Sequence, residues 1–262
     1  MPPKMDSRVF ITLESFENSY ITIVEWETPL LNRLAHPLVA DGDLAYLVPD
    51  DQIQLANNIA VVSGLRLAKD DDFRRRCLTQ YVNQGTLYAH GNPKRRFILA
   101  PLSWTGIERD ELSIVTPPVE SIPCTIWTVP LSSCCAAYLR IIMQESKNSR
   151  VRDIASADLS GIIAYGMFGM TYEGSYMKTP EDDPEEDNDK SVDFLDEAAW
   201  KEKDALEMRD VLCKIRGWQF KMKDEWLRDM LIQLVSGNLR YEALPSRETQ
   251  QGGTTEPETG HA

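Results

Sequence analysis

The chain is short of positive charge. It has 262 residues, with 28 Lys and Arg against 41 Asp and Glu, and its net charge is −13. Proteins that bind DNA or RNA in bulk usually present a basic surface, because phosphate contacts supply much of their affinity. The composition therefore argues against a bulk nucleic-acid partner, although a local basic patch can still hold a nucleotide.

Long apolar runs and paired cysteines are also missing. The chain has no run of about 18 apolar residues, so we expect no spanning helix and no membrane partner. Residues 1–8 lack the apolar core of a signal peptide. The five cysteines show no CxxC spacing, which disfavours structural zinc and a disulfide framework. We expect free thiols and a location in a reducing compartment, the cytoplasm or the nucleus.

Several motifs with known chemistry are absent. The chain has neither of the phosphate loops GxGxxG and GxxxxGK[ST], and it has no GxSxG nucleophile motif. Outside the C-terminal tail its only histidines are His36, which precedes a proline, and His90, which precedes a Gly-Asn-Pro turn. A small-molecule hydrolase is therefore a remote alternative.

What the chain does contain is a set of short strands followed by longer helices. Runs of β-branched and aromatic residues that end at prolines predict strands, and amphipathic runs with capping residues predict helices. The predicted strands are 20–26, 44–48, 86–89, 96–100, 112–116 and 125–129. The predicted helices are 30–34, 51–63, 132–144, 157–170, 191–216 and 223–235.

This order predicts an α/β (α+β) fold with two parts. Residues 1–130 would form a mixed sheet with flanking helices, and residues 131–244 a helical half in which the apolar helix 157–170 is central. Residues 178–191 are strongly acidic and predict a disordered insert, either simply solvated or able to recruit a basic partner. Residues 245–262 are polar and predict a disordered tail.

One spacing suggests chemistry. Asp41 and Asp43 flank Gly42 directly ahead of the strand 44–48, and in an extended chain residues two apart point to the same face. Two neighbouring carboxylates repel each other unless a cation such as Mg²⁺ lies between them. With a third acid from a neighbouring strand they would form a two-metal phosphoryl or nucleotidyl transfer site. The alternative is a solvated turn built on Gly42.

The residues after this pair form a consistent local unit. The strand 44–48 ends at Pro49, and Asp50 is placed to cap the helix 51–63 through its side chain. Gly64 then suits the end of that helix.

The stretch DGDLAYLVPDDQIQLANNIAVVSGL resembles the Asp-x-Asp strand and following helix of the nucleotidyltransferase (polymerase-β-like) superfamily. It is similar to the small nucleotidyltransferase-like proteins of filamentous fungi, and VPLSSCCAAYLRIIMQ and LSGIIAYGMF are similar to the first helices of their helical half. Over residues 38–170 the resemblance implies Mg²⁺-dependent transfer from a nucleoside triphosphate to an unidentified acceptor hydroxyl. It makes Asp41 and Asp43 metal ligands and catalytic residues. Glu111, with Asp110 beside it, is the positional candidate for the third catalytic acid.

The chain departs from that family ahead of the acids. The family has a Gly-Gly or Gly-Ser turn and a short helix about ten residues earlier, whereas residues 29–37 contain no glycine. The basic runs 74–76 and 94–96 could hold the triphosphate instead, with Arg95 and Arg96 as candidates, or could be ordinary surface charge.

Two functions therefore stay open. One is a Mg²⁺-dependent nucleotidyltransferase. The other is a catalytically degenerate, non-enzymatic interaction or accessory protein of a fungal pathway, secondary metabolism included, with an unidentified protein partner. Fold alone does not choose between them.

Overall fold

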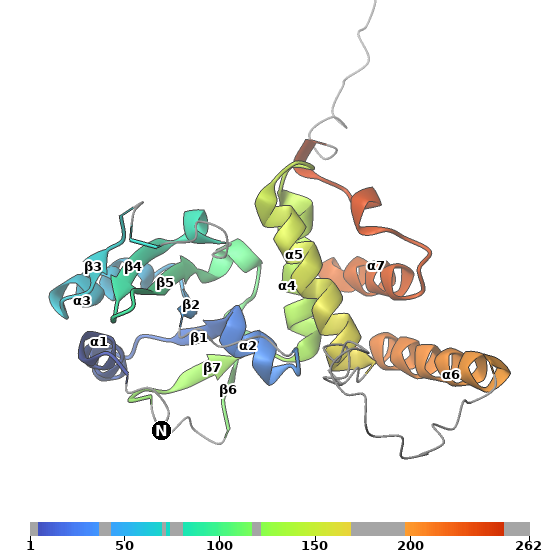
Figure 1. The fold of residues 1–262 in the computed structure, drawn as a ribbon, viewed down its shortest axis with the longest axis horizontal. Helices are drawn as coiled ribbons and strands as arrows, with labels where there is room; N and C mark the ends of the chain where they lie inside the picture. The colour runs from blue at the N-terminus through green and yellow to red at the C-terminus, as the bar shows by residue number, and fades with distance from the viewer. Residues whose placement is uncertain are drawn as a thin grey trace, which may run out of the picture.

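A mixed seven-stranded sheet with helices packed against it forms the body of the protein (Figure 1). The computed structural model describes residues 5–36, 43–69, 72–73, 81–116, 122–168 and 197–248. The strand order is β3-β4-β5-β2-β1-β7-β6. The predicted α/β class is confirmed. In the described ranges, no helix is long and apolar enough to cross a membrane.

The predicted strands are all present, and the structure adds one more. The strands are β1 (Ile23–Trp26), β2 (Leu44–Val48), β3 (Arg66–Leu67), β4 (Thr86–His90), β5 (Arg95–Pro101), β6 (Ser113–Ile114) and β7 (Ile126–Thr128). The sequence did not predict β3, which is only two residues long.

The predicted helices are also present, with one shifted start. The α-helices are α1 (Ser7–Asn18), α2 (Thr28–Arg33), α3 (Ile53–Val62), α4 (Leu131–Gln144), α5 (Arg150–Gly161), α6 (Glu197–Arg216) and α7 (Glu225–Val235). Short 3₁₀ helices are η1 (Val82–Gln84), η2 (Leu102–Thr105), η3 (Arg109–Glu111), η6 (Met222–Asp224) and η7 (Tyr241–Ala243), and η4 (Ile162–Met167) is π-helical. Helix α1 was not predicted, and α5 begins at Arg150 rather than at 157.

The parallel pairing of β2 with β5 lies at the centre of the sheet. Leu44 is opposite Phe97 and Val48 is opposite Pro101, while β1 runs antiparallel to β2 on its other side. Because the two parallel strands start at the same edge of the sheet, the residues just before β2 lie beside the first residues of β5. The loops that follow Val48 and Pro101 meet at the opposite edge.

Each face of the sheet carries its own hydrophobic core, because side chains alternate along β2. Tyr46 and Val48 belong to the core under α1 and α3, and Ala45 and Leu47 to the core shared with the C-terminal helices. The second core runs without a break from β1 to Leu244. The sheet half and the helical half are therefore joined by common apolar packing.

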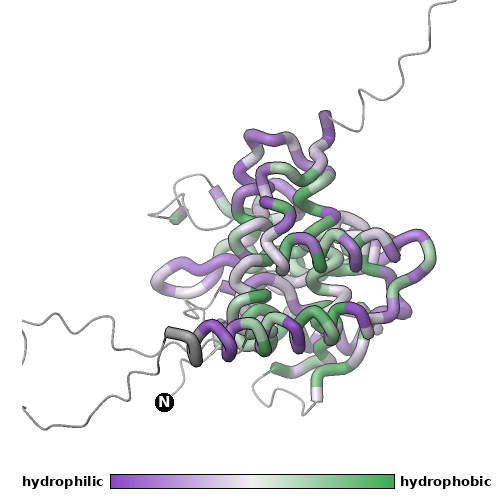
Figure 2. Tube along the Cα trace, turned by 90° about the vertical axis from the view of Figure 1, so that its right-hand side faces the viewer, coloured by the Kyte–Doolittle hydropathy of each residue, from purple (hydrophilic) through white to green (hydrophobic). Residues whose placement is uncertain are grey.

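The central helix of the second half is α4, not the predicted helix 157–170. Nine of its residues are buried, including the run from Ser133 to Leu139, because it lies between the sheet, α5 and α7. Viewed from the helical side, Figure 2 shows hydrophobic and hydrophilic residues alternating along the helices of this half, as expected for amphipathic helices.

Asp50 does not cap α3 as predicted. The residue before α3 is Gln52, which makes no capping hydrogen bond with its side chain. The Asp50 carboxylate instead accepts the backbone N–H of Ser103 at 3.1 Å and its hydroxyl at 2.6 Å. Asp50 thus joins the loops after β2 and β5, a contact between residues far apart in sequence.

A buried arginine fixes the end of the described chain. Arg152 of α5 is 4% exposed, and its guanidinium donates to the backbone carbonyls of Ile142, Tyr241, Leu244 and Pro245. Ser246 is fully buried. The tail predicted to begin at 245 is therefore anchored at its first two residues, and residues 249–262, like the acidic stretch 178–191, lie outside the described residues.

Replacing Arg152 should release this segment. We expect Arg152→Met to lower the free energy of unfolding by about 3 kcal/mol, because several buried carbonyls lose their donor. Limited proteolysis should then cut first near residues 241–248. Arg209→Met, at an exposed position of α6, is the control, and equal protease resistance of the two variants would contradict the anchoring role.

Candidate functional site

Asp43, the described member of the predicted acid pair, is held by an arginine. Its carboxylate accepts the backbone N–H of Arg96 at 2.8 Å and the Nη1 of the same residue at 2.8 Å. The Arg96 side chain is 9% exposed and that of Asp43 18% exposed, and the guanidinium also lies 4.8 Å from the centre of the Phe73 ring. The parallel register of β2 and β5 therefore places a cation where the resemblance would require an acid.

Of the other predicted acids, only Glu111 belongs to the described residues, and its carboxylate is engaged elsewhere. Asp41 lies outside the described residues. Glu111 ends η3, where its carboxylate accepts the backbone N–H of Glu108 at 2.8 Å in a reciprocal capping box. Within the described part of the chain, no three Asp, Glu, His or Cys side chains are grouped as a metal ion requires. Asp43 and Glu111, as placed, therefore do not form a Mg²⁺ site with any third described side chain, and the role of Asp41 stays a prediction.

The basic run before β5 neutralises carboxylates of the protein itself. Lys94 donates to Asp72 at 2.5 Å, and this hydrogen bond holds the pKa of Asp72 well below its usual value. Arg96 is paired with Asp43. Arg95 starts β5 opposite His90 of β4, and its role toward a triphosphate stays a prediction. The second basic run, 74–76, lies outside the described residues.

The turn between β1 and α2 has a backbone conformation that no residue pattern in the sequence predicts. Glu27 has φ 52° and ψ −131°, a region that L-residues rarely adopt, and the short helix α2 follows at once with Pro29 in its first turn. The resemblance implies a glycine turn and a short helix ahead of the acids. The structure has a positive-φ residue, Glu27, followed by the short helix α2, ahead of β2.

Next to this turn, aromatic side chains surround a carboxylate that the sequence analysis missed. The ring of Trp26 stacks on Tyr138 of α4 at 5.1 Å and meets Trp104 edge-on at 6.1 Å, and Tyr81 lies 5.0 Å from Trp104. The Tyr81 hydroxyl donates to Asp158 of α5 at 3.0 Å. We call these five residues the aromatic–acid cluster.

The cluster changes the ionisation of its own members. Burial raises the pKa of Asp158 to about 6, and the hydrogen bond from the Tyr81 hydroxyl offsets part of this rise. Burial, followed by the nearby Asp158 carboxylate, raises the pKa of both Tyr81 and Tyr138 well above the usual value. The phenols therefore stay protonated donors at neutral pH, while Asp158 can exchange a proton close to neutrality, as a general acid or base would.

A histidine on the chain leading to Asp41 packs on the same helix. The His36 ring stacks on Tyr165 at 5.4 Å with 13° between the planes, and burial lowers its pKa. A Cβ atom on Gly161 would lie 2.3 Å from Cε1 of His36, so this approach requires glycine. His36 and Asp43, the described residues on either side of residues 37–42, are thus both fixed by tertiary contacts.

A cavity lies at the other edge of the sheet. It has a volume of about 570 Å³ and lies beyond the carboxyl ends of β2 and β5, between the loop at Pro49–Asp51, the segment around η2 and η3, and Lys223. Parallel strand ends are a common place for ligands in α/β proteins.

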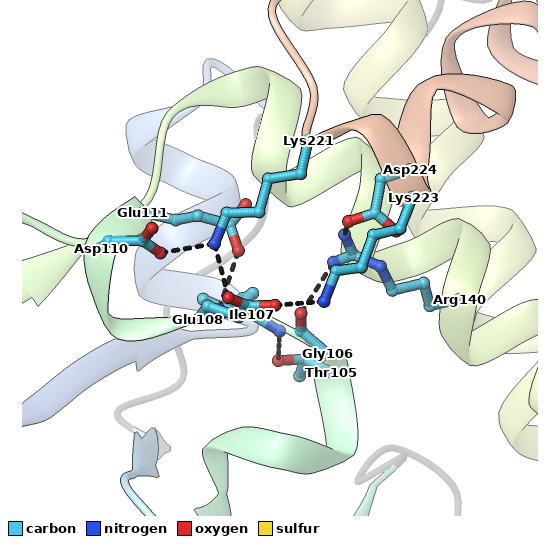
Figure 3. Close-up of polar contacts among 10 residues, drawn as sticks. All are labelled: Thr105, Gly106, Ile107, Glu108, Asp110, Glu111, Arg140, Lys221, Lys223 and Asp224. Carbon is cyan, nitrogen blue, oxygen red and sulfur yellow. Dashed lines mark hydrogen bonds and ion pairs between the residues drawn. The ribbon is translucent and has the colours of Figure 1, made fainter.

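Lys223, from the segment between α6 and α7, lines that cavity, and the same segment makes charged contacts with residues at η3 and on α4 (Figure 3). Lys221 contacts Glu108 at 2.5 Å and Asp110 at 2.8 Å, and Lys223 also pairs with Glu108. Arg140 of α4 donates to the Gly106 carbonyl at 3.0 Å and to Asp224 at 2.8 Å. Asp110 and Glu111 therefore belong to a network that joins the two halves of the protein.

The coupling of Asp43 to Arg96 can be measured with a double-mutant cycle. We expect Asp43→Ala to lower the free energy of unfolding by about 2 kcal/mol, because the backbone N–H and the nearly buried guanidinium of Arg96 both lose the carboxylate that accepts from them. Arg96→Met should cost a similar amount, and the double variant clearly less than the two together. Asp51→Ala, which breaks an exposed pair with Arg109, is the control and should change stability little. Additive costs in urea titrations would contradict the coupling.

The raised pKa of Asp158 predicts a pH dependence of stability. An acid whose folded pKa is above its unfolded pKa binds a proton more tightly in the folded state, so stability falls as pH rises from about 4 to about 6 and the loss is complete above that range. Asp158→Asn keeps an acceptor for Tyr81 and removes the charge. We expect it to stabilise the protein at pH 7 by about 2 kcal/mol, which is on the order of the free energy that corresponds to the raised pKa of Asp158.

Thermal unfolding between pH 4 and pH 7 measures this effect. Asp153→Asn, exposed on the same helix, is the matched control and should leave the pH slope unchanged. A wild-type slope that persists in Asp158→Asn would contradict the assignment.

Comparison with known proteins returned no family model, no curated protein and no solved structure that matches the chain. Its function is therefore inferred from its own residues.

Proposed function

We propose that the protein is a nucleotidyltransferase-like protein that has lost metal-dependent transfer and acts by binding a protein partner. The observation that carries the proposal is the pairing of Asp43 with Arg96. A carboxylate that would bind Mg²⁺ must present its oxygens to the ion at about 2.0–2.1 Å. Here both oxygens face the backbone N–H and guanidinium of one residue of the neighbouring strand.

Charge makes the replacement of this pair by a metal ion unfavourable. A Mg²⁺ ion at the Asp43 carboxylate would lie beside the Arg96 guanidinium, so the two cations would repel each other. Moving Arg96 away would expose a side chain that is now packed on Phe73 and 9% exposed. In a two-metal site, by contrast, the neighbouring strand supplies a further acid.

The relation to nucleotidyltransferases rests on the resemblance of residues 38–170, and the backbone ahead of β2 supports it. The strand β1, the positive-φ turn at Glu27, the short helix α2 and then the Asp41–Asp43 segment follow in the order that the resemblance implies. Retention of this backbone without a glycine turn fits a scaffold that has kept its shape and given up its phosphate contact.

A second candidate is Mg²⁺-dependent nucleotidyl transfer to an unidentified acceptor hydroxyl. The backbone of Glu27 favours it, since a non-glycine residue in such a region costs of order 1–3 kcal/mol and strained residues cluster at functional sites. Asp41 would then have to bind the metal ion, because the Asp43 carboxylate is bound to Arg96.

Thermal shift with each of the four common nucleoside triphosphates, with and without Mg²⁺, separates the two functions. For the binding protein we expect no Mg²⁺-dependent rise in melting temperature, and the loss of stability in Asp43→Ala should be the same with and without Mg²⁺ and nucleotide. Asp41→Asn should behave like the wild type.

The opposite pattern would establish the enzyme. A Mg²⁺–nucleotide shift in the wild type that disappears in both Asp41→Asn and Asp43→Ala, together with release of pyrophosphate in the presence of an acceptor, would overturn the binding proposal. Asp51→Ala serves as the control for simple removal of one acidic charge.

A further inference from the structure

Helix α3 carries no charge, although 26% of the residues of the chain are charged. Its inner face places Ala56 and Ala60 on the sheet, and both are fully buried. On its outer side Leu55 is 49% exposed, Val61 55% and Val62 88%. A helix that is apolar around most of its circumference is normally buried. In this protein it lies at the outer end of the sheet, away from α6 and α7 (Figure 1).

Leu67 of the edge strand β3 extends this apolar surface. It is 56% exposed and pairs in register with Tyr88, whose hydroxyl donates to the side chain of Asn57 at 2.9 Å. Since Val61 is one helical turn beyond Asn57, Leu67 lies along the same flank of α3. We call Leu55, Val61, Val62 and Leu67 the α3 patch.

The size of the α3 patch matches the centre of a protein interface. Its four side chains expose roughly 400 Å² of apolar surface, which is within the range of the largest patch on a typical monomer and often marks a contact site. A specific interface buries about 800 Å² on each partner, of which a little more than half is apolar. The α3 patch therefore supplies the apolar part of one such interface.

We propose that the α3 patch binds the α3 patch of a second copy of this chain, with the two helices antiparallel about a two-fold axis. Leu55, Asn58 and Val62 are spaced three and four residues apart on the outer face. In the antiparallel arrangement Leu55 meets Val62 of the other copy, and Asn58 meets its own symmetry mate at the axis. An isologous contact requires such self-complementarity.

The amides fit the same arrangement. Gln54 donates to Asn58 at 3.3 Å along the exposed face, so the polar groups at the centre of the patch are already oriented together. A pair of asparagines facing each other at an apolar helix contact can exchange hydrogen bonds and fix its register.

The absence of charge on α3 also favours a second copy of this chain as the partner that covers the patch. Two chains of net charge −13 repel each other over most of their surfaces, and a helix without charged residues is where they can meet at the least electrostatic cost. The remaining repulsion is screened by salt. We therefore expect a dimer that strengthens as NaCl is raised, opposite to the behaviour of an interface built on ion pairs.

Sedimentation velocity over a range of protein concentrations tests the proposal on the full chain. We expect the wild type to dimerise, and Leu55→Glu to weaken the dimer at least tenfold because two new carboxylates would be buried at the contact. Leu206→Glu on α6 is a closely matched control, since Leu206 is also 49% exposed, and it should leave the dimer unchanged. Both sites are exposed enough for the substituted chains to fold, which circular dichroism checks.

Site-specific cross-linking tests the two-fold arrangement itself. In a Cys213→Ser background, which removes the thiol that is exposed among the described cysteines, Asn58→Cys should give a covalent dimer with a short bis-maleimide. Leu206→Cys in the same background should not.

A wild type that stays monomeric at about 100 µM and 0.5 M NaCl would overturn the proposal, and so would equal effects of Leu55→Glu and Leu206→Glu. Dimerisation without cross-linking at position 58 would overturn the antiparallel arrangement. None of these outcomes depends on whether Asp43 binds a metal ion.

Discussion

The parallel pairing of β2 with β5 determines what lies at each edge of the sheet. At the amino ends of the two strands the register places Asp43 against Arg96, and at the carboxyl ends it brings Asp50 to Ser103 and opens the cavity beside η2 and η3. One residue of slip between the strands would separate Asp43 from Arg96 and move every side chain of β5 to the other face. The two separate cores of the sheet prevent that slip.

Most buried acids of the sheet half are matched by a cation rather than left for a ligand. Glu25, which is 2% exposed, accepts hydrogen bonds from Nε and Nη2 of Arg33. Asp72 forms ion pairs with Lys94 and Arg66. Asp43 with Arg96 follows the same pattern. Asp158 differs, because it accepts a hydrogen bond from the Tyr81 hydroxyl and, among the described residues, forms no ion pair with a cation, and burial raises its pKa to about 6. A search for proton-linked behaviour in this protein therefore belongs at the aromatic–acid cluster.

Local sequence signals predicted much of the fold. The apolar run before Pro49 and the amphipathic runs of α4 and α7 specify their own structures, and the mixed sheet followed from them. Helix α1 was missed because Val9, Ile11 and Thr12 are β-branched and typical of strands. It forms a helix because the Asp6 carboxylate caps its first turn by accepting the backbone N–H of Arg8. In addition, Val9, Leu13 and Phe16 recur with helical spacing and are buried.

The candidate site was less predictable, since it depends on contacts between distant parts of the chain. The spacing of Asp41 and Asp43 contains no information that β5, about fifty residues later, would bring an arginine. Nothing in the sequence marks Glu27 as the positive-φ residue, because glycine is the usual signal. Asp158 is the one charged residue of the largely apolar predicted helix 157–170. Only the packing of α5 beside Tyr81 and Tyr138 shows that its carboxyl group is a candidate for proton exchange.

Electron paramagnetic resonance with Mn²⁺ in place of Mg²⁺ tests directly whether the Asp43 carboxylate pairs with Arg96 and does not bind a metal ion. A solution of Mn²⁺ and nucleoside triphosphate is titrated with the wild type and with Arg96→Met, which frees the carboxylate. We expect the wild type to leave the Mn²⁺ spectrum unchanged and only Arg96→Met to broaden it. Loss of the free Mn²⁺ signal on addition of the wild type, restored by Asp43→Ala, would contradict the pairing of Asp43 with Arg96.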